Sequence, residues 1–335
     1  PWSQVFMDPM VGPSIVARVA PGSSPVTDYR AALWFTVAGA AWAMAWCAGR
    51  FGLPGGFAWS AGVVYAIGPY AAGHFHHLNQ VPAPWLPLAL GALVGLLRGE
   101  RTRVHAGLFV LALALQAAWS VYATAALVLG AVVLVLAHGP AGWRAPGAKT
   151  AVGVVLGSLA VLAVAAVPYV LAGRALGEFG RETDQVLAFQ ARWFDLWKAA
   201  EPRLLPWPGH DPLRPALYPG AVWFALAAVG AVRGWSTREG RAVVLIGATG
   251  LLFAFGRDFL VPFTSIHVPL PFAWLQDLVW PLRALRDPSR FALLLSWATA
   301  LLAAGTVRVL WTRRRAVAIG VVAVAAIDLA PGPFA

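Results

Sequence analysis

Apolar runs about as long as a membrane-spanning helix recur along this chain, separated by polar loops. A spanning helix needs roughly 20 mainly apolar residues, and the pattern predicts ten such helices. Their ranges are 31–49, 56–73, 83–97, 104–118, 121–138, 150–172, 217–232, 241–256, 290–310 and 316–330. The apolar stretch 104–138 is too long for one span, so the polar residues around Ser120 predict a tight turn within it. The sequence therefore predicts an all-α fold, a polytopic transmembrane helix bundle that forms a single domain over residues 1–335.

Three polar segments outside these spans are long enough to hold structure of their own. They cover residues 1–30, 173–216 and 257–289. Within the last two, apolar residues recur at three- and four-residue spacing over Val186–Trp197 and Leu270–Leu282. This spacing, with several Trp and Phe residues, predicts short amphipathic helices that lie in the membrane interface.

The composition strengthens the membrane interpretation and excludes several function classes. The chain is 59% hydrophobic with a mean hydropathy of +0.69, and its 12% of charged residues is about half the value for soluble domains. It contains no P-loop, no dinucleotide-binding glycine pattern, no His-Glu-x-x-His and no nucleophile elbow. The absence of a nucleotide-binding motif argues against an ATP-driven pump. The one cysteine, Cys47, lies in an apolar run, so no disulfide framework is expected.

Charged residues are divided unequally between alternate loops. One set of loops holds 13 of the 25 basic residues but only two of the 14 acids, Glu100 and Glu239. These basic residues are Arg50, Arg98, Arg101, Arg103, Arg144, Lys149, Arg233, Arg238, Arg241, Arg308, Arg313, Arg314 and Arg315. Because Lys and Arg accumulate in cytoplasmic loops, we predict that this set lies inside and the acid-bearing loops lie outside. The net charge of +11 is then a signal of topology, and no nucleic-acid partner is expected.

Histidines and amides crowd one outer turn, at the end of the second predicted span. Its sequence is Gly73-His74-Phe75-His76-His77-Leu78-Asn79-Gln80, with His74, His76, His77 and Asn79 as the candidate binding residues. Neutral imidazole binds metal ions and protonated imidazole pairs with anions, so this turn is suited to a divalent metal ion or a phosphate. The alternative is a polar interfacial turn that caps two helices.

A second cluster, of arginines, precedes the span 290–310. It contains Arg283, Arg286, Asp287, Pro288 and Arg290. Pro288 fits the start of a helix. Helix N-termini favour anions and Arg side chains bind phosphate oxygens in bidentate fashion, so the cluster predicts a lipid phosphate at the outer leaflet. The alternative is that the arginines only extend toward the polar interface.

Several outer acids are candidates for a general base. Asp8 stands out because apolar residues surround it, and an apolar environment favours proton uptake by a carboxylate. Asp258 is another of these outer acids. Asp328, near the outer end of the last span, is an ionisable residue at membrane depth, and such residues are often functional.

Taken in order, several segments resemble a known group of bacterial membrane proteins. They are Tyr65-Ala66-Ile67-Gly68-Pro69-Tyr70, His77-Leu78-Asn79, Trp85-Leu86-Pro87-Leu88-Ala89-Leu90, Leu217-Tyr218-Pro219-Gly220, and the Arg-x-Pro-x-Arg-Phe element within Leu282–Phe291. Over about residues 1–310 the chain resembles membrane glycosyltransferases of the GT-C type, a group that includes YfhO-like and mannosyltransferase-like proteins.

The resemblance implies transfer of a sugar from a polyprenyl-phosphate donor, a membrane lipid, to an acceptor on the outer face. It also implies an essential acid in the first outer loop, acting as a base or a metal partner. Residues 1–30 correspond to the later part of that loop, and the chain begins at Pro1 without Met or a signal peptide. We therefore expect a piece of a longer protein that lacks the family's first helix, and Asp8 is the candidate acid within it.

The resulting hypothesis is a glycosyltransferase of the bacterial cytoplasmic membrane whose active face is periplasmic or extracellular. Arg286 and Arg290 hold the phosphate, His76 and His77 contact the leaving phosphate or the acceptor, and Asp8 deprotonates the acceptor hydroxyl. The alternative is a transporter or flippase of a lipid-linked or anionic solute, which predicts charges deep within the spans. A structural or assembly role is the third interpretation left open.

Overall fold

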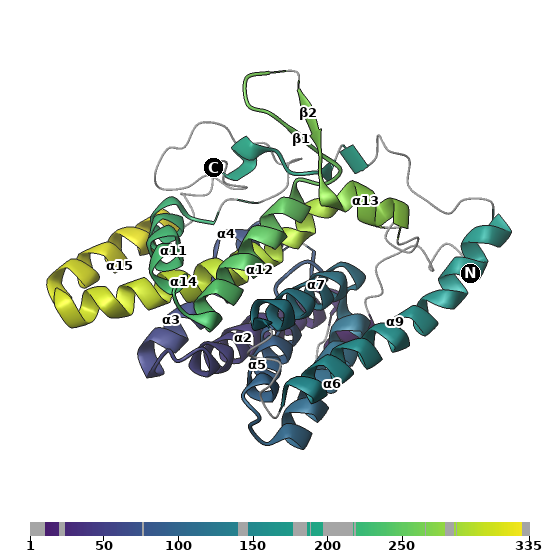
Figure 1. Ribbon diagram of the computed structural model, residues 1–335, viewed down its shortest axis with the longest axis horizontal. Coiled ribbons are helices and arrows are strands. Elements are labelled where there is room, and N and C mark those ends of the chain that lie inside the picture. Colours follow the sequence, from purple (N-terminus) through teal and green to yellow (C-terminus); the bar gives the residue numbers. More distant parts are fainter. Residues whose placement is uncertain are drawn as a thin grey trace.

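The structure is a computed structural model, and it describes most of the helical part of the chain (Figure 1). The described residues are 11–19, 24–75, 77–139, 147–176, 186–187, 189–196, 217, 219–264, 266–278, 285 and 287–329. Within them the secondary structure is helical apart from one two-stranded hairpin. This predominance of helices confirms the all-α prediction.

Each predicted apolar run overlaps a helix. These helices are α2 (Pro25–Arg50), α3 (Gly55–Ile67) with the short α4 (Pro69–Ala72), α5 (Trp85–Leu97), α6 (Thr102–Trp119), α7 (Val121–Ala137), α9 (Ala148–Leu176), α11 (Ala221–Gly234), α12 (Arg238–Ala254), α14 (Ala292–Arg313) and α15 (Arg315–Leu329). Among the described residues, three helical stretches are long and apolar enough to cross a membrane: Pro25–Arg50, Thr102–Trp119 and Pro288–Arg313.

Short polar residues set the beginnings of several helices. Ser120 is extended between α6 and α7, and its Oγ accepts a hydrogen bond from the Ala123 backbone N–H at 3.4 Å. A serine hydroxyl at this position satisfies one of the N–H groups that a helix start leaves unpaired. The predicted division of the stretch 104–138 is therefore confirmed. The one-turn 3₁₀ helix η4 (Pro288–Phe291) leads into α14, so the predicted helix start at Pro288 is also confirmed.

Two helices form the centre of the bundle. In α5 every residue from Leu86 to Leu97 is buried, with α2, α6, α7 and α9 packed around it. A helix that is apolar on all sides lies in a protein core or spans a membrane, and α5 lies in the core of the bundle. Helix α14 occupies a similar place among α3, α11, α12 and α15. Between these two central helices, Gly130 of α7 lies close to Leu90 of α5 and Leu294 of α14.

Glycine allows the closest helix contacts. A Cβ at Gly62 of α3 would lie 2.3 Å from the Ala41 carbonyl oxygen of α2, and one at Gly230 of α11 would lie 2.3 Å from the Leu302 carbonyl oxygen of α14. No larger residue fits at either position without separating the two backbones. Close approach at small residues is how helices associate in lipid, where apolar side chains gain little by avoiding the solvent.

The exterior of the bundle is also apolar. Trp34 of α2 is 72% exposed, Val164 of α9 is 71% exposed and Val232 of α11 is 80% exposed. In water this much exposed apolar surface marks an interaction site or an aggregation liability, whereas in a bilayer it faces hydrocarbon. The exposed apolar side chains and the three long apolar helices together indicate a membrane protein.

The remaining elements are short and lie around the ends of the long helices. They are α1 (Val11–Val19), the 3₁₀ helix η2 (Trp193–Leu196), β1 (Asp258–Leu260), β2 (His267–Pro269) and α13 (Pro271–Leu278). The amphipathic helix predicted over Leu270–Leu282 is present as α13, with Phe272 buried and Trp274 exposed; residues 279–282 lie outside the described residues.

The helix predicted over Val186–Trp197 is wrong as a continuous element, because residues 190–192 are not helical. The Arg192 backbone N–H donates to the Asp195 carboxylate at 2.7 Å, and the Ala191 N–H donates to the Ala254 carbonyl oxygen at 2.9 Å. These bonds replace the helical ones. The antiparallel hairpin β1–β2, which pairs Phe259 with Val268, was not predicted and lies beside α13 (Figure 1).

Candidate functional site

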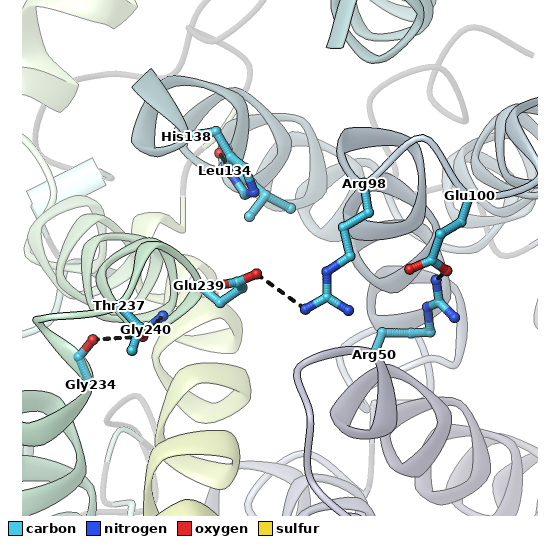
Figure 2. Close-up of polar contacts among 9 residues, drawn as sticks. All are labelled: Arg50, Arg98, Glu100, Leu134, His138, Gly234, Thr237, Glu239 and Gly240. Atoms are coloured by element: carbon cyan, nitrogen blue, oxygen red, sulfur yellow. Dashed lines mark hydrogen bonds and ion pairs between the residues drawn. The ribbon is translucent and has the colours of Figure 1, made fainter. Parts of the chain in front are cut away.

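The loops predicted to lie inside meet at one end of the bundle. Arg50, at the end of α2, forms an ion pair with Glu100, and Arg98, at the end of α5, pairs with Glu239 of α12 at 3.1 Å (Figure 2). Both acids of this set of loops are thus paired with an arginine from a different loop. The hydrogen bond from Arg50 holds the pKa of Glu100 below its ordinary value of 4.5.

Two further contacts bring the other basic loops to the same place. The Arg308 guanidinium of α14 donates to the Gly52 carbonyl oxygen at 2.9 Å. A Cβ at Gly147, just before α9, would lie 1.6 Å from the Leu96 carbonyl oxygen of α5. We call this end, formed by residues 50–54, 98–101, 147, 234–239 and 308–315, the basic end.

The opposite helix ends gather the segments predicted to lie outside. Tyr29 donates through its hydroxyl to the Phe75 carbonyl oxygen, which joins the start of α2 to the turn after α4. The hydrogen bond from the Ala191 N–H to the Ala254 carbonyl oxygen joins the segment around η2 to the end of α12. We call this end the hairpin end, because the hairpin β1–β2 belongs to it. Among the described residues, the two predicted sets of loops therefore lie at different ends of the bundle, and which end faces the cytoplasm stays a prediction.

Arg290 is the one candidate arginine among the described residues, and its side chain is only 12% exposed. Its Nε donates to Asp287 Oδ2 at 2.9 Å, and the Ser289 hydroxyl donates to Asp287 Oδ1. The guanidinium carbon lies 4.0 Å from the centre of the Tyr122 ring, a cation–π distance. Asp287 and Tyr122 thus fix the guanidinium in one orientation at the start of the helix that becomes α14.

Tyr70 connects Arg290 to His74. The Tyr70 hydroxyl donates to the Arg290 carbonyl oxygen at 3.4 Å, and the Tyr70 and His74 rings lie 4.5 Å apart. His74 Nδ1 is 2.6 Å from the Tyr70 carbonyl oxygen, which can only accept, so Nδ1 carries the hydrogen. The histidine turn and the arginine segment, predicted separately, therefore lie together at the hairpin end.

The histidine turn does not act as one cluster among the residues that the structure describes. His74 is buried, whereas His77 is exposed and Asn79 is half-buried. The described residues contain no group of three His, Cys, Asp or Glu side chains arranged to hold a metal ion. Since His76 lies outside the described residues, the predicted divalent metal stays a prediction. Asp8, Arg283 and Arg286 also lie outside them.

A cleft adjoins Tyr70 on the side of the bundle formed by α3, α11 and α14. The cleft is small and partly open to the surroundings. Most of its lining is apolar, and its polar groups are Tyr70, Ser296 and Thr299. The cleft therefore runs along the apolar part of the bundle and reaches the residue that contacts Arg290.

Asp328 has a structural role that the sequence did not predict. It is 2% exposed near the end of α15, and its Oδ2 accepts a hydrogen bond from the Val222 backbone N–H at 3.1 Å. Val222 lies in the first turn of α11, where N–H groups have no partner within the helix. A carboxylate here satisfies one of them and interacts favourably with the positive end of the helix dipole.

The hairpin carries two polar residues whose partnership the sequence did not reveal. His267 Nδ1 donates to Asp258 Oδ2 across the two strands, and Gln190 Nε2 donates to Asp258 Oδ1 at 2.8 Å. Asp258 was recognised as an outer acid, but His267 was not connected with it. The signal available was weak: two short β-prone stretches around a turn that contains Pro262, Thr264 and Ser265.

Comparison with protein-family models finds no family that matches this sequence, and comparison with curated proteins finds no relative. The resemblance to GT-C glycosyltransferases therefore depends only on the sequence segments given above and on their order along the chain.

Proposed function

We propose that this chain is the membrane part of a glycosyltransferase that uses a polyprenyl-phosphate sugar on the outer face of the bacterial cytoplasmic membrane. In this proposal its ten helical runs all span the bilayer, with the basic end in the cytoplasm and the hairpin end outside. The charge difference between the ends supports this orientation, because arginine-rich loops stay in the cytoplasm. The hairpin end then lies beside the lipid phosphates of the outer leaflet.

The observation that carries the proposal is the environment of Arg290. The guanidinium is 12% exposed and is fixed by Asp287 and Tyr122, so it is an oriented positive charge. The backbone carbonyl of the same residue contacts Tyr70, which lines the apolar cleft. A polyprenyl phosphate has a charged head and an apolar tail, so in this proposal the tail lies along the apolar exterior of the bundle and Arg290 binds the head. Stabilisation of a departing phosphate by oriented charges is a large contribution to catalysis of group transfer.

The test is sugar transfer by the full-length protein in proteoliposomes. Polyprenyl-phosphate sugars, radiolabelled in the sugar, are added with candidate acceptors, and both the transferred label and the sidedness of the lipid are measured. The proposal expects label on the acceptor, with transfer reduced in Arg286→Ala. Movement of the labelled lipid across the bilayer without transfer identifies a flippase instead. Neither transfer nor movement, with no binding of the lipid, identifies a structural protein.

A further inference from the structure

The hairpin at the hairpin end presents an oriented histidine. His267 of β2 donates its Nδ1 hydrogen to the Asp258 carboxylate of β1, and its side chain is 57% exposed. In a neutral ring whose Nδ1 carries the hydrogen, Nε2 is the basic nitrogen. A carboxylate that fixes the tautomer and orientation of an imidazole is the arrangement that enzymes use to position a histidine base.

Asp258 is itself held by a third residue. Gln190 donates to its second carboxylate oxygen at 2.8 Å, so the two oxygens have different partners and the carboxylate is fixed in rotation. Asp258 is 21% exposed, much less than the histidine that it orients. A base oriented by a group that is in turn oriented is the geometry expected of catalytic acid–base groups, and a surface ion pair does not require it.

The base of the hairpin is attached to the segment that carries Arg290. A Cβ at Gly256 would lie 2.7 Å from Gln190 and 3.0 Å from Pro288, which begins the turn containing Arg290. Gly256 has a φ of +75°, in the region that favours glycine.

A second link starts at Arg257, next to Asp258 in the chain. Arg257 donates to the Gln276 side chain at 3.0 Å, and Gln276 donates to the Leu285 carbonyl oxygen at 3.1 Å. The histidine pair and the proposed phosphate-binding arginine are therefore parts of one connected structure at one end of the bundle.

We propose that His267 is the general base of the transfer reaction, oriented by Asp258; this rests on the function proposed above. His267 Nε2 takes the proton of the acceptor hydroxyl while the hydroxyl oxygen bonds to the anomeric carbon of the sugar. The bond between that carbon and the donor phosphate oxygen breaks, and its electron pair leaves on the phosphate. Asp258 stabilises the imidazolium, which then releases its proton to water. Asp8 is not needed as the base.

The first test is His267→Ala in the full-length protein, with a polyprenyl-phosphate sugar as the donor. We expect kcat to fall about 100-fold or more, the usual contribution of a general base, with little change in the KM for the donor. Because His267 is exposed, added imidazole can occupy the vacated space and should restore part of the rate. Val268→Thr on the same strand, as the matched control, should keep the wild-type rate.

Asp258→Asn tests the positioning role. It should lower kcat less than His267→Ala, and it should cause no further loss in the His267→Ala background, because residues that act as a unit are non-additive. Wild-type transfer by His267→Ala overturns the assignment, as does a loss that imidazole does not restore in a variant of unchanged melting temperature. If the wild-type protein transfers no sugar, the proposed function itself fails.

Discussion

The two ends of the bundle use their acidic residues in different ways. At the basic end, Glu100 and Glu239 are 40% and 35% exposed and pair with arginines from other loops. At the hairpin end, the Asp287 and Asp258 side chains are 14% and 21% exposed and each orients a neighbour, Arg290 or His267. The acids of the basic end connect loops, whereas those of the hairpin end fix the direction of another functional group.

This difference favours the hairpin end as the place of the proposed reaction. An exposed ion pair contributes little free energy and leaves its side chains adjustable. A catalytic group must be held close to one geometry, usually by a neighbour that is itself held. Arg290, between Asp287 and Tyr122, meets that requirement. His267 is 57% exposed and meets it because its partner Asp258 is itself held by Gln190.

The largest effect is expected in a test of whether the two ends face opposite sides of the membrane. With Cys47 replaced by alanine, Ser236→Cys marks the basic end and Thr264→Cys marks the hairpin. A maleimide that cannot cross membranes should label Thr264→Cys in intact cells and Ser236→Cys only after lysis. Labelling of both in intact cells, or the reverse order, would contradict the orientation, and the Cys47→Ala protein alone should stay unlabelled.

A comparison of arginines tests the functional difference. Arg290→Ala removes the oriented charge and should lower kcat/KM for sugar transfer by about 10²–10³-fold, the usual cost of losing one stabilising donor. Arg290→Lys should recover only part of this rate, because an ammonium cannot reproduce the planar fork of a guanidinium. Arg308→Ala, at the basic end, is the matched control. Equal losses for Arg290→Ala and Arg308→Ala would remove the distinction between the ends.

The helices could be predicted from the sequence, because they depend on local patterns. Long apolar runs become helices when their backbone groups have no water to bond with, and the breaks at Ser120 and before Pro288 depend on residues within a few positions. The grouping of loops into two ends also followed from the sequence, because charge sidedness is a property of whole loops.

The contacts of the site could not be predicted, because they join residues far apart in the chain. The stacking of Arg290 on Tyr122 and the hydrogen bond from the Val222 N–H to Asp328 depend on helix packing that no local pattern records. The pairing of His267 with Asp258 depends on the register of two strands of three residues each, too short for a clear alternating pattern. In each case the residue type was visible and its partner was not.

Stability offers a third contrast, between buried and exposed carboxylates. Asp328→Ala leaves the Val222 N–H without its partner and should lower the free energy of unfolding by about 1–2 kcal/mol, the cost of losing a helix cap. Asp328→Asn keeps an acceptor oxygen and should cost less. Glu239→Ala at the basic end should cost less than Asp328→Ala. Unfolding in detergent, followed by circular dichroism, measures all three, and an inverted order would show that the exposed pairs are the stronger ones.

The ion pairs of the basic end should prove weak in a double-mutant cycle. The coupling between Arg98→Ala and Glu239→Ala should be about 0.2–1 kcal/mol, the range for exposed pairs. Added salt should reduce it, because exposed charges are screened over about 10 Å at 0.1 M ionic strength. A coupling that exceeds this range and resists salt would mean that the basic end is as firmly organised as the hairpin end.

The smallest effect is the pH dependence of the Glu100 pair. The hydrogen bond from Arg50 lowers the pKa of Glu100 in the folded state, so the pair stabilises the fold above the ordinary value of 4.5 and loses this contribution as the pH falls through the lowered pKa. Glu100→Gln should therefore melt slightly below the wild-type protein at about pH 7, and the difference should shrink under acidic conditions. Because Glu100 is 40% exposed, solvent screening keeps the difference small. A difference that grows on acidification would show that the carboxylate is not held by Arg50, and that the two ends do not differ in the way proposed.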